Sequence, residues 1–213
     1  MLASVVLVFN YQISLVRVYS QLIAIFNHKL LVVLQLANWH LNPLEEKRMK
    51  LESLHELFVA ELQDLYSAEN MIVKALPKVI EKVSSHDLKT ALTEHLEETK
   101  VQVDRLDQIF DQLGDEVDRK GRKCKGMDGI LKENKEFLGE DAEPEVLDAG
   151  VIAGAQKVEH YEIAGYGTVR AYASLLGRTE WMGMLEVTLE EEKAADKKLS
   201  QLAEKINVQA KAA

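Results

Sequence analysis

The sequence is poor in the residues that interrupt helices or build disulfide-bonded folds. Its 213 residues include only 3 prolines, 11 glycines and 1 cysteine, and aromatic residues make up 6%. Because proline and glycine are the strongest helix breakers, their scarcity favours long uninterrupted helices. The lone cysteine, Cys124, excludes an internal disulfide, so we expect a reducing, cytoplasmic location. Basic neighbours such as Arg122 and Lys123 favour a reactive thiolate at this position, whereas an incidental loop position makes the thiol inert.

Positive charge is also scarce. The chain has 26 Lys and Arg residues against 35 Asp and Glu residues, which gives a formal net charge of -9. A nucleic-acid-binding domain normally presents a basic face, so the composition argues against a nucleic-acid partner. The hydrophobic content of 47% and charged content of 29% are ordinary for a globular protein.

Residues 1–48 differ in composition from the rest, because they are rich in Leu, Val and Ile and contain almost no acids. None of their apolar runs reaches the roughly 18 residues of a membrane-spanning helix. The cationic start and the small-residue cleavage site of a secretory signal are missing. We interpret the segment as an extension outside the fold that results from a misplaced start codon; membrane contact or partner binding through residues 1–48 is the alternative. We assign residues 49–207 to a helical domain and 208–213 to a disordered tail.

Helical periodicity divides the domain into four long helices and one short helix. Ser53 and Glu56 form a capping-box pattern at the first start, and Pro77 predicts a kink or break inside that helix. Pro144 suits the first turn of the third long helix. The predicted spans are 53–83, 84–114, 127–138, 144–177 and 179–206. They form two helical hairpins whose connection contains the short helix.

The two hairpins repeat each other at a constant spacing. The residue numbers of Glu69 and Glu162 differ by 93, as do those of Glu98 and Glu191. The same shift superposes leucines of the second hairpin on leucines of the first. A single spacing for both helices of a hairpin indicates an internal repeat, in which each helix contributes one glutamate.

These four glutamates lie on the apolar stripes of their helices. Carboxylates that converge in a medium of low dielectric repel one another, and two divalent cations would balance the charge. The pattern therefore predicts a di-metal site of the kind that helical bundles build from inward-facing carboxylates. His95 and Glu159 lie three residues before Glu98 and Glu162 and face the same centre. Oxygen and imidazole ligands suit iron or manganese.

An alternative interpretation places the glutamates at the margins of the stripes, with buried stems and carboxylates in water. A common spacing for all four argues against it. We expect Glu97, Glu190 and Glu192 to be solvated and paired with nearby lysines. Gln102 and Asp196 are candidate ligands or supporting groups, and Tyr66, Tyr161 and Tyr166 are either hydrogen-bond donors to ligands or plain core residues.

Four strings carry a family resemblance: DLYSAE at 64–69, HLEET at 95–99, QKVEHYEIA at 156–164 and LEEEK at 189–193. Over about residues 51–205 the chain resembles the bacterial YciE/YciF family of ferritin-like proteins. The resemblance implies an all-α, up-down four-helix bundle similar to rubrerythrin, a homodimer, and a role in bacterial stress responses. The metal ligands that it implies are Glu69, Glu98, Glu159, Glu162 and Glu191, with His95 beside them.

Two functions fit these observations. The first is a di-iron or di-manganese oxidoreductase that reduces peroxide or oxidises ferrous iron. It would need an external reductant, because no Cys-x-x-Cys pair is present for electron relay. The second is a non-catalytic stress protein with a structural or vestigial metal site. The Glu-x-x-His pattern usual in ferritins and rubrerythrins is missing, because Val101 and Ala194 stand three residues after Glu98 and Glu191. Fewer nitrogen ligands argue against efficient oxygen activation.

Overall fold

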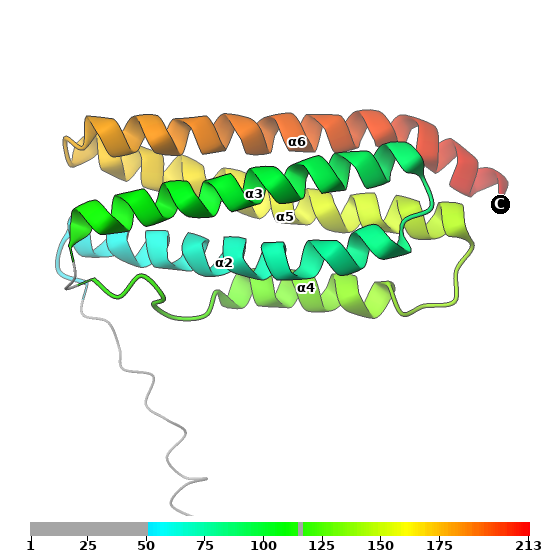
Figure 1. Ribbon diagram of the computed structural model, residues 1–213, viewed down its shortest axis with the longest axis horizontal. Helices are drawn as coiled ribbons and strands as arrows, with labels where there is room; N and C mark the ends of the chain where they lie inside the picture. Colours follow the sequence, from blue (N-terminus) through cyan, green and yellow to red (C-terminus); the bar gives the residue numbers. More distant parts are fainter. Residues whose placement is uncertain (1–50, 115–116) are drawn as a thin grey trace, which may run out of the picture. The chain divides into compact units, whose positions relative to one another are not determined.

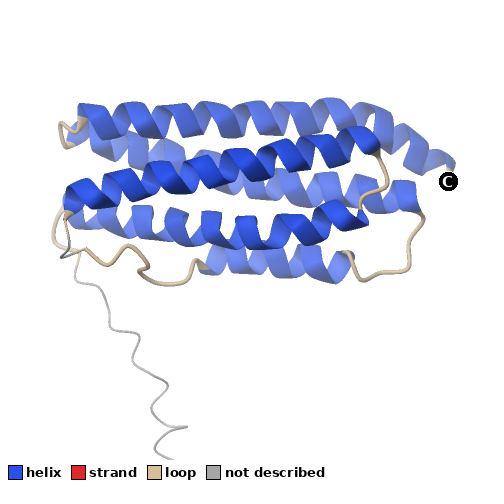
Figure 2. Cartoon of the chain, in the orientation of Figure 1, coloured by secondary structure: helices blue, strands red, loops and turns tan. Residues whose placement is uncertain are grey.

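A computed structural model describes residues 51–114 and 117–213, so the predicted N-terminal extension lies outside the described residues. The described part contains five helices and no strands (Figure 2). Their bounds are α2 Leu54–Lys82, α3 His86–Leu113, α4 Lys125–Phe137, α5 Pro144–Leu175 and α6 Thr179–Ala212.

The four long helices form a bundle of two helical hairpins, α2–α3 and α5–α6 (Figure 1). Across the bundle α2 packs against α5 and α3 packs against α6. The end of α3 and the start of α5 lie at opposite ends of the bundle, and α4 bridges that distance while packing on α5 and α2. The predicted fold class is confirmed: an all-α bundle built from two hairpins, with a short additional helix in the connection.

The ends of the helices agree with the sequence signals. The Ser53 hydroxyl accepts from the Glu56 amide at 3.2 Å, and the Glu56 carboxylate accepts from the Ser53 amide at 3.0 Å, which completes the capping box. Gly114 and Gly177 follow α3 and α5 with φ of 91° and 69°, values that glycine adopts without strain.

Two predictions about helix continuity differ from the structure. α2 runs without a break through Pro77, because buried residues on the same turns, Ile72 and Leu76, hold it against the bundle. α6 continues to Ala212, so residues 208–212 are helical where the sequence predicted a disordered tail. Ile206 is buried in this last part, which anchors the final turns to the core.

Cys124 is a structural residue at the start of α4. Its sulfur accepts from the Met127 amide at 3.3 Å and lies 3.1 Å from an Asp64 carboxylate oxygen and 2.9 Å from the Tyr161 hydroxyl. Burial raises the pKa of the thiol, so it stays protonated at neutral pH. Of the two alternatives for Cys124, its burial and the raised pKa favour the inert thiol.

The core consists of two apolar clusters along the bundle. One includes Phe58, Leu62, Leu106 and Trp181, and the other includes Ile72, Leu92, Val151 and Leu199. Each long helix contributes to both clusters and carries polar buried residues between them. Within residues 51–114 and 117–213, no helix combines the length and apolar character needed to cross a membrane.

Candidate metal centre

A layer of buried polar side chains separates the two apolar clusters, and every long helix contributes to it. α2 contributes Glu69, α3 contributes His95, Thr99 and Gln102, α5 contributes Glu159 and Glu162, and α6 contributes Thr188 and Glu192. Four glutamates in one buried layer would be strongly destabilising without compensation. The partners of each carboxylate therefore decide what the layer can do.

Glu162 has no hydrogen-bond donor in the described structure. Its side chain is 1% exposed, and both carboxylate oxygens are buried without a partner. Glu69, on the facing helix, accepts one hydrogen bond from the Tyr166 hydroxyl, and its second oxygen has no partner. Native structures rarely leave buried oxygens in this state unless water or an ion meets them.

Glu162 belongs to a group of four residues whose ligand atoms converge. His95, Glu159, Glu162 and Glu192 each offer one atom, and these atoms all lie within 4.8 Å of one another. The His95 Nε2 atom is 3.5 Å from a Glu159 oxygen, and neither imidazole nitrogen makes a hydrogen bond. Ligands bound at about 2.1 Å lie up to roughly 4.2 Å apart across an ion, so a small contraction brings all four to bonding distance.

The electrostatics of the layer favour a cation. Burial, and then repulsion from Glu69, Glu192 and Glu159, raises the pKa of Glu162 well above its ordinary value. Burial and the Glu192 carboxylate do the same for Glu159, and burial raises the pKa of Glu192. Burial, and then repulsion from Glu192, also raises the pKa of Glu69, and the smaller effects of Tyr166 and Arg105 act in the opposite direction. A divalent cation would replace the protons that these carboxyl groups otherwise retain.

The residues of the layer fit an ion of the iron and manganese type. They offer carboxylate oxygens and one imidazole, all buried and mostly without competing donors. Gln102 donates to one Glu192 oxygen and leaves the other without a partner, so it orients Glu192 as a supporting residue would.

Two predicted ligands lie at the edge of the layer. The Glu98 side chain is 53% exposed, with an oxygen 3.9 Å from the His95 Nδ1 atom on the side away from Glu159. Glu191 is 29% exposed and forms a two-point ion pair with Arg105, at 2.9 and 3.0 Å. The prediction that these two carboxylates point into the core is wrong, because each lies one residue off the buried stripe of its helix.

Glu192 is a buried acid that the sequence pattern missed. It was expected in solvent and is fully buried, whereas Glu97 and Glu190 are exposed and paired with Lys100 and Lys193 as predicted. The signal was present in the sequence: Leu185, Glu192, Leu199 and Ile206 recur every seventh residue, and all four are buried.

The other polar candidates also include residues inside the layer and residues outside it. Tyr166 donates to Glu69 inside the layer, whereas Tyr161 donates to Asp64 at 2.5 Å next to Cys124. Tyr66 packs edge-on against Phe110. Asp196 accepts from Gln156 at 3.0 Å outside the converging group.

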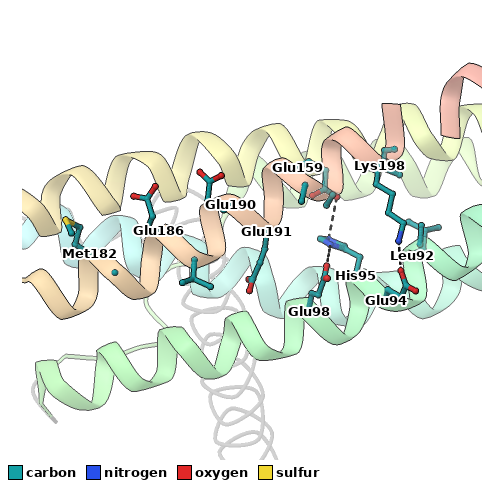
Figure 3. A pocket seen from close by; sticks show the side chains of 16 residues that line it. Leu92, Glu94, His95, Glu98, Glu159, Met182, Glu186, Glu190, Glu191 and Lys198 are labelled. Atoms are coloured by element: carbon teal, nitrogen blue, oxygen red, sulfur yellow. Dashed lines mark hydrogen bonds and ion pairs between the residues drawn. The ribbon is translucent and has the colours of Figure 1, made fainter. Parts of the chain in front are cut away.

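A surface groove between α3 and α6 leads to the layer (Figure 3). It has a volume of about 680 Å³ and an apolar lining that includes Leu92 and Val187. His95 and Glu159 belong to its wall, and Figure 3 shows His95 between Glu98 and Glu159. The centre is therefore buried but has a route to the surface.

The fold and this layer define an all-helical bundle protein with a buried cluster of histidine and glutamate. The chain belongs to the family described as a domain of unknown function, DUF892, whose model matches residues 53–213. It is 42% identical to Protein YciF of Escherichia coli strain K12 over 155 residues, which is 73% of this chain and 93% of that protein.

Solved structures agree with this assignment. The crystal structure of the E. coli stress protein YciF matches with a TM-score of 0.70 and 41% identity, covering 73% of this chain and 97% of that chain. YcfI of Rhodopseudomonas palustris matches with a TM-score of 0.68 and 47% identity, covering 71% of this chain and 95% of that chain. The chain is thus similar to a bacterial stress protein along nearly the whole length of that protein.

Proposed function

We propose that this protein binds divalent iron or manganese in the buried layer and acts in a bacterial stress response through that metal. The observation that carries the proposal is Glu162, whose two buried oxygens have no donor and face a histidine and three further carboxylates. The similarity to a protein described as a stress protein supports the physiological setting. A ferritin-like di-metal centre is the arrangement that the sequence predicts.

The chemistry follows from the ligand types. A bound iron or manganese ion would supply redox chemistry, which would serve either the two-electron reduction of peroxide by an external reductant or the oxidation of ferrous iron by peroxide. The chain's own residues hold and isolate the site: Gln102 orients Glu192, Tyr166 donates to Glu69, and the two apolar clusters exclude water on both sides. The α3–α6 groove gives a small oxidant access to the side of His95 and Glu159.

A second candidate is a non-catalytic stress protein in which the ion only stabilises the bundle. One observation favours it: His95 is the single nitrogen ligand of the converging group. A carboxylate-dominated set binds a divalent ion while supporting oxygen activation less well than a set richer in histidine. Peroxide consumption with an external reductant separates the two candidates.

Two adjacent glutamates provide a matched test. Glu192→Gln removes a buried carboxylate of the converging group, whereas Glu191→Gln removes its neighbour, which pairs with Arg105. After loading with Mn²⁺ and gel filtration, we expect E192Q to retain at least about tenfold less metal than the parent protein. E191Q should stay within about threefold.

Equal metal loss in both variants, or none in either, would refute the assignment of the site. Metal-loaded parent protein that leaves peroxide and ferrous iron unchanged would favour the non-catalytic candidate. Circular dichroism of both variants checks that the helices persist.

A further inference from the structure

We infer that the buried layer holds one divalent ion, beside Glu162, and that Arg105 takes the place of a second ion. The inference rests on the proposed function, because it assumes that the layer binds metal. It concerns the number of ions and the residue that sets this number. It departs from the expectation of two ions that the internal repeat suggested.

The internal repeat divides the layer into two sides. One side consists of His95, Glu159 and Glu192 around Glu162, and the other consists of the equivalent positions around Glu69. The spacing of 93 holds in the structure, because Glu69 and Glu162 are both buried, as are Leu92 and Leu185. A symmetric di-metal site would therefore need similar ligands at each pair of equivalent positions. Apart from Glu162 and its equivalent Glu69, the ligands have no acidic or imidazole counterpart: His95 corresponds to Thr188, Glu159 to Tyr66, and Glu192 to Thr99.

The three counterparts are also engaged elsewhere. The Thr99 hydroxyl donates to the main-chain oxygen of His95 at 2.9 Å. The Thr188 hydroxyl accepts from Arg105. Tyr66 packs against the ring of Phe110, with ring centroids 5.6 Å apart. Among the described residues on the Glu69 side, Glu69 is the carboxylate that remains free to bind an ion, because Glu191 is paired with Arg105.

Arg105 brings a permanent positive charge to this side. Its guanidinium donates to Thr188 and holds Glu191 by two hydrogen bonds, and its side chain is only 15% exposed. The repeat places Lys198 at the equivalent position, and Lys198 pairs with Glu94 on the surface instead. The two sides therefore differ in charge as well as in ligands.

These differences have one consequence for metal binding. The side with His95, Glu159 and Glu192 supplies three ligands in addition to Glu162. The other side offers a single free carboxylate, Glu69, because Arg105 holds the neighbouring Glu191 in an ion pair that a second divalent ion would have to break. Arg105 is thus a specificity-determining residue for the metal count, acting by charge and by engaging Glu191 and Thr188.

The metal count of the full chain tests this directly. Apo-protein is titrated with MnCl₂ in equilibrium dialysis, bound manganese is counted by mass spectrometry, and the bound ion is examined by electron paramagnetic resonance. We expect saturation at one Mn²⁺ per chain, the hyperfine pattern of an isolated ion, and any second ion bound at least about tenfold more weakly.

Two ions per chain with a spin-coupled spectrum would overturn the inference and leave the proposed function intact. An absence of bound manganese would overturn both.

A built second site gives the positive test. The double variant T99E/R105Q supplies the missing carboxylate and removes the cation, so its count should rise from one to two. K198Q, the change at the position equivalent to Arg105, should leave the count at one. A double variant that is helical by circular dichroism but still binds one ion would overturn the role of Arg105. If the double variant does not fold, the count of the parent protein still decides between one ion and two.

Discussion

Two buried acidic residues of this bundle, Asp148 and Glu162, differ in the hydrogen-bond donors that surround their carboxylates. At the turn between α2 and α3, Asp148 is 2% exposed and accepts from the Ser84 amide at 2.9 Å, the Ser84 hydroxyl at 2.6 Å and the Ser85 amide at 2.7 Å. In the central layer Glu162 is as deeply buried and accepts no hydrogen bond from the residues that the structure describes. Burial alone therefore does not define a site; a buried carboxylate without donors does.

The comparison assigns opposite roles to the two acids. Asp148 joins α5 to the turn that starts α3, so its charge serves the fold. Glu162 weakens the metal-free fold, because a buried carboxylate without donors costs free energy that only a proton or a cation recovers.

The largest expected effect is on metal retention. Glu162→Gln removes the central ligand of the converging group, so we expect the affinity for Mn²⁺ to fall by more than about 100-fold. Asp148→Asn is the control, because it changes a buried acid outside the layer and should retain metal like the parent protein. Elemental analysis after gel filtration measures both variants, and a similar metal content in E162Q and the parent would remove Glu162 from the site.

The same two variants should change metal-free stability in opposite directions. D148N loses charge-assisted hydrogen bonds to two amides and a hydroxyl, so unfolding should become easier by about 2–4 kcal/mol. E162Q replaces a buried carboxyl, which must keep a proton at neutral pH, with a neutral amide, so the apo-protein should gain about 1–2 kcal/mol. Urea unfolding with chelator present gives both values, and destabilisation by E162Q would show that Glu162 has partners in the native state.

The layer also predicts the pH dependence of the apo-protein. Burial raises the pKa values of Glu162, Glu159 and Glu69, so the folded state retains protons that the unfolded chain releases above its carboxyl pKa of about 4.3. The stability that these protons give is complete below that value and is lost as pH rises through the folded-state pKa values. Thermal unfolding should therefore occur at lower temperature at about pH 8 than at about pH 5.

Bound Mn²⁺ should reduce this slope, because the ion takes the place of the protons. The double variant E162Q/E192Q should flatten it in the apo-protein. An apo-protein whose stability rises from pH 5 to pH 8 would contradict the assignment.

The smallest expected effect on metal affinity concerns Tyr166, because the Glu69 carboxyl to which it donates lies outside the converging group. Tyr166→Phe removes the hydroxyl that donates to Glu69, which should cost about 1–3 kcal/mol of apo stability in urea unfolding. Tyr161→Phe is the matched control near Cys124, and it should leave metal affinity unchanged. An equal effect of Y166F and Y161F on metal affinity would show that the Tyr166 hydroxyl, which donates to Glu69, does not contribute to metal binding.

The fold could be predicted almost completely from the sequence because its signals are local. The Ser53–Glu56 capping box, Gly114 after α3 and Pro144 at the start of α5 each fix a helix end through nearest neighbours. At Pro77 a local rule predicts a kink or a break, and α2 continues through this residue without a break because tertiary packing holds its turns against the bundle.

The site was harder, because successive residues of a helix differ in direction by about 100°. The strings at 95–99 and 189–193 contain adjacent acids, and the predicted apolar stripes through Glu98 and Glu191 lie one residue away from the stripes that the structure buries. In α3 that stripe passes through His95, Thr99 and Gln102, and in α6 through Thr188 and Glu192. Arg105 could not be placed from sequence, because its partner Glu191 lies 86 residues away.

The most direct test of the central claim is anomalous X-ray diffraction from crystals of the full chain grown with Mn²⁺. The account predicts one strong manganese peak per chain, at bonding distance from His95, Glu159, Glu162 and Glu192. A peak only on the surface, or no peak within the bundle, would show that these carboxylates are met by protons or water and that the layer is not a metal centre.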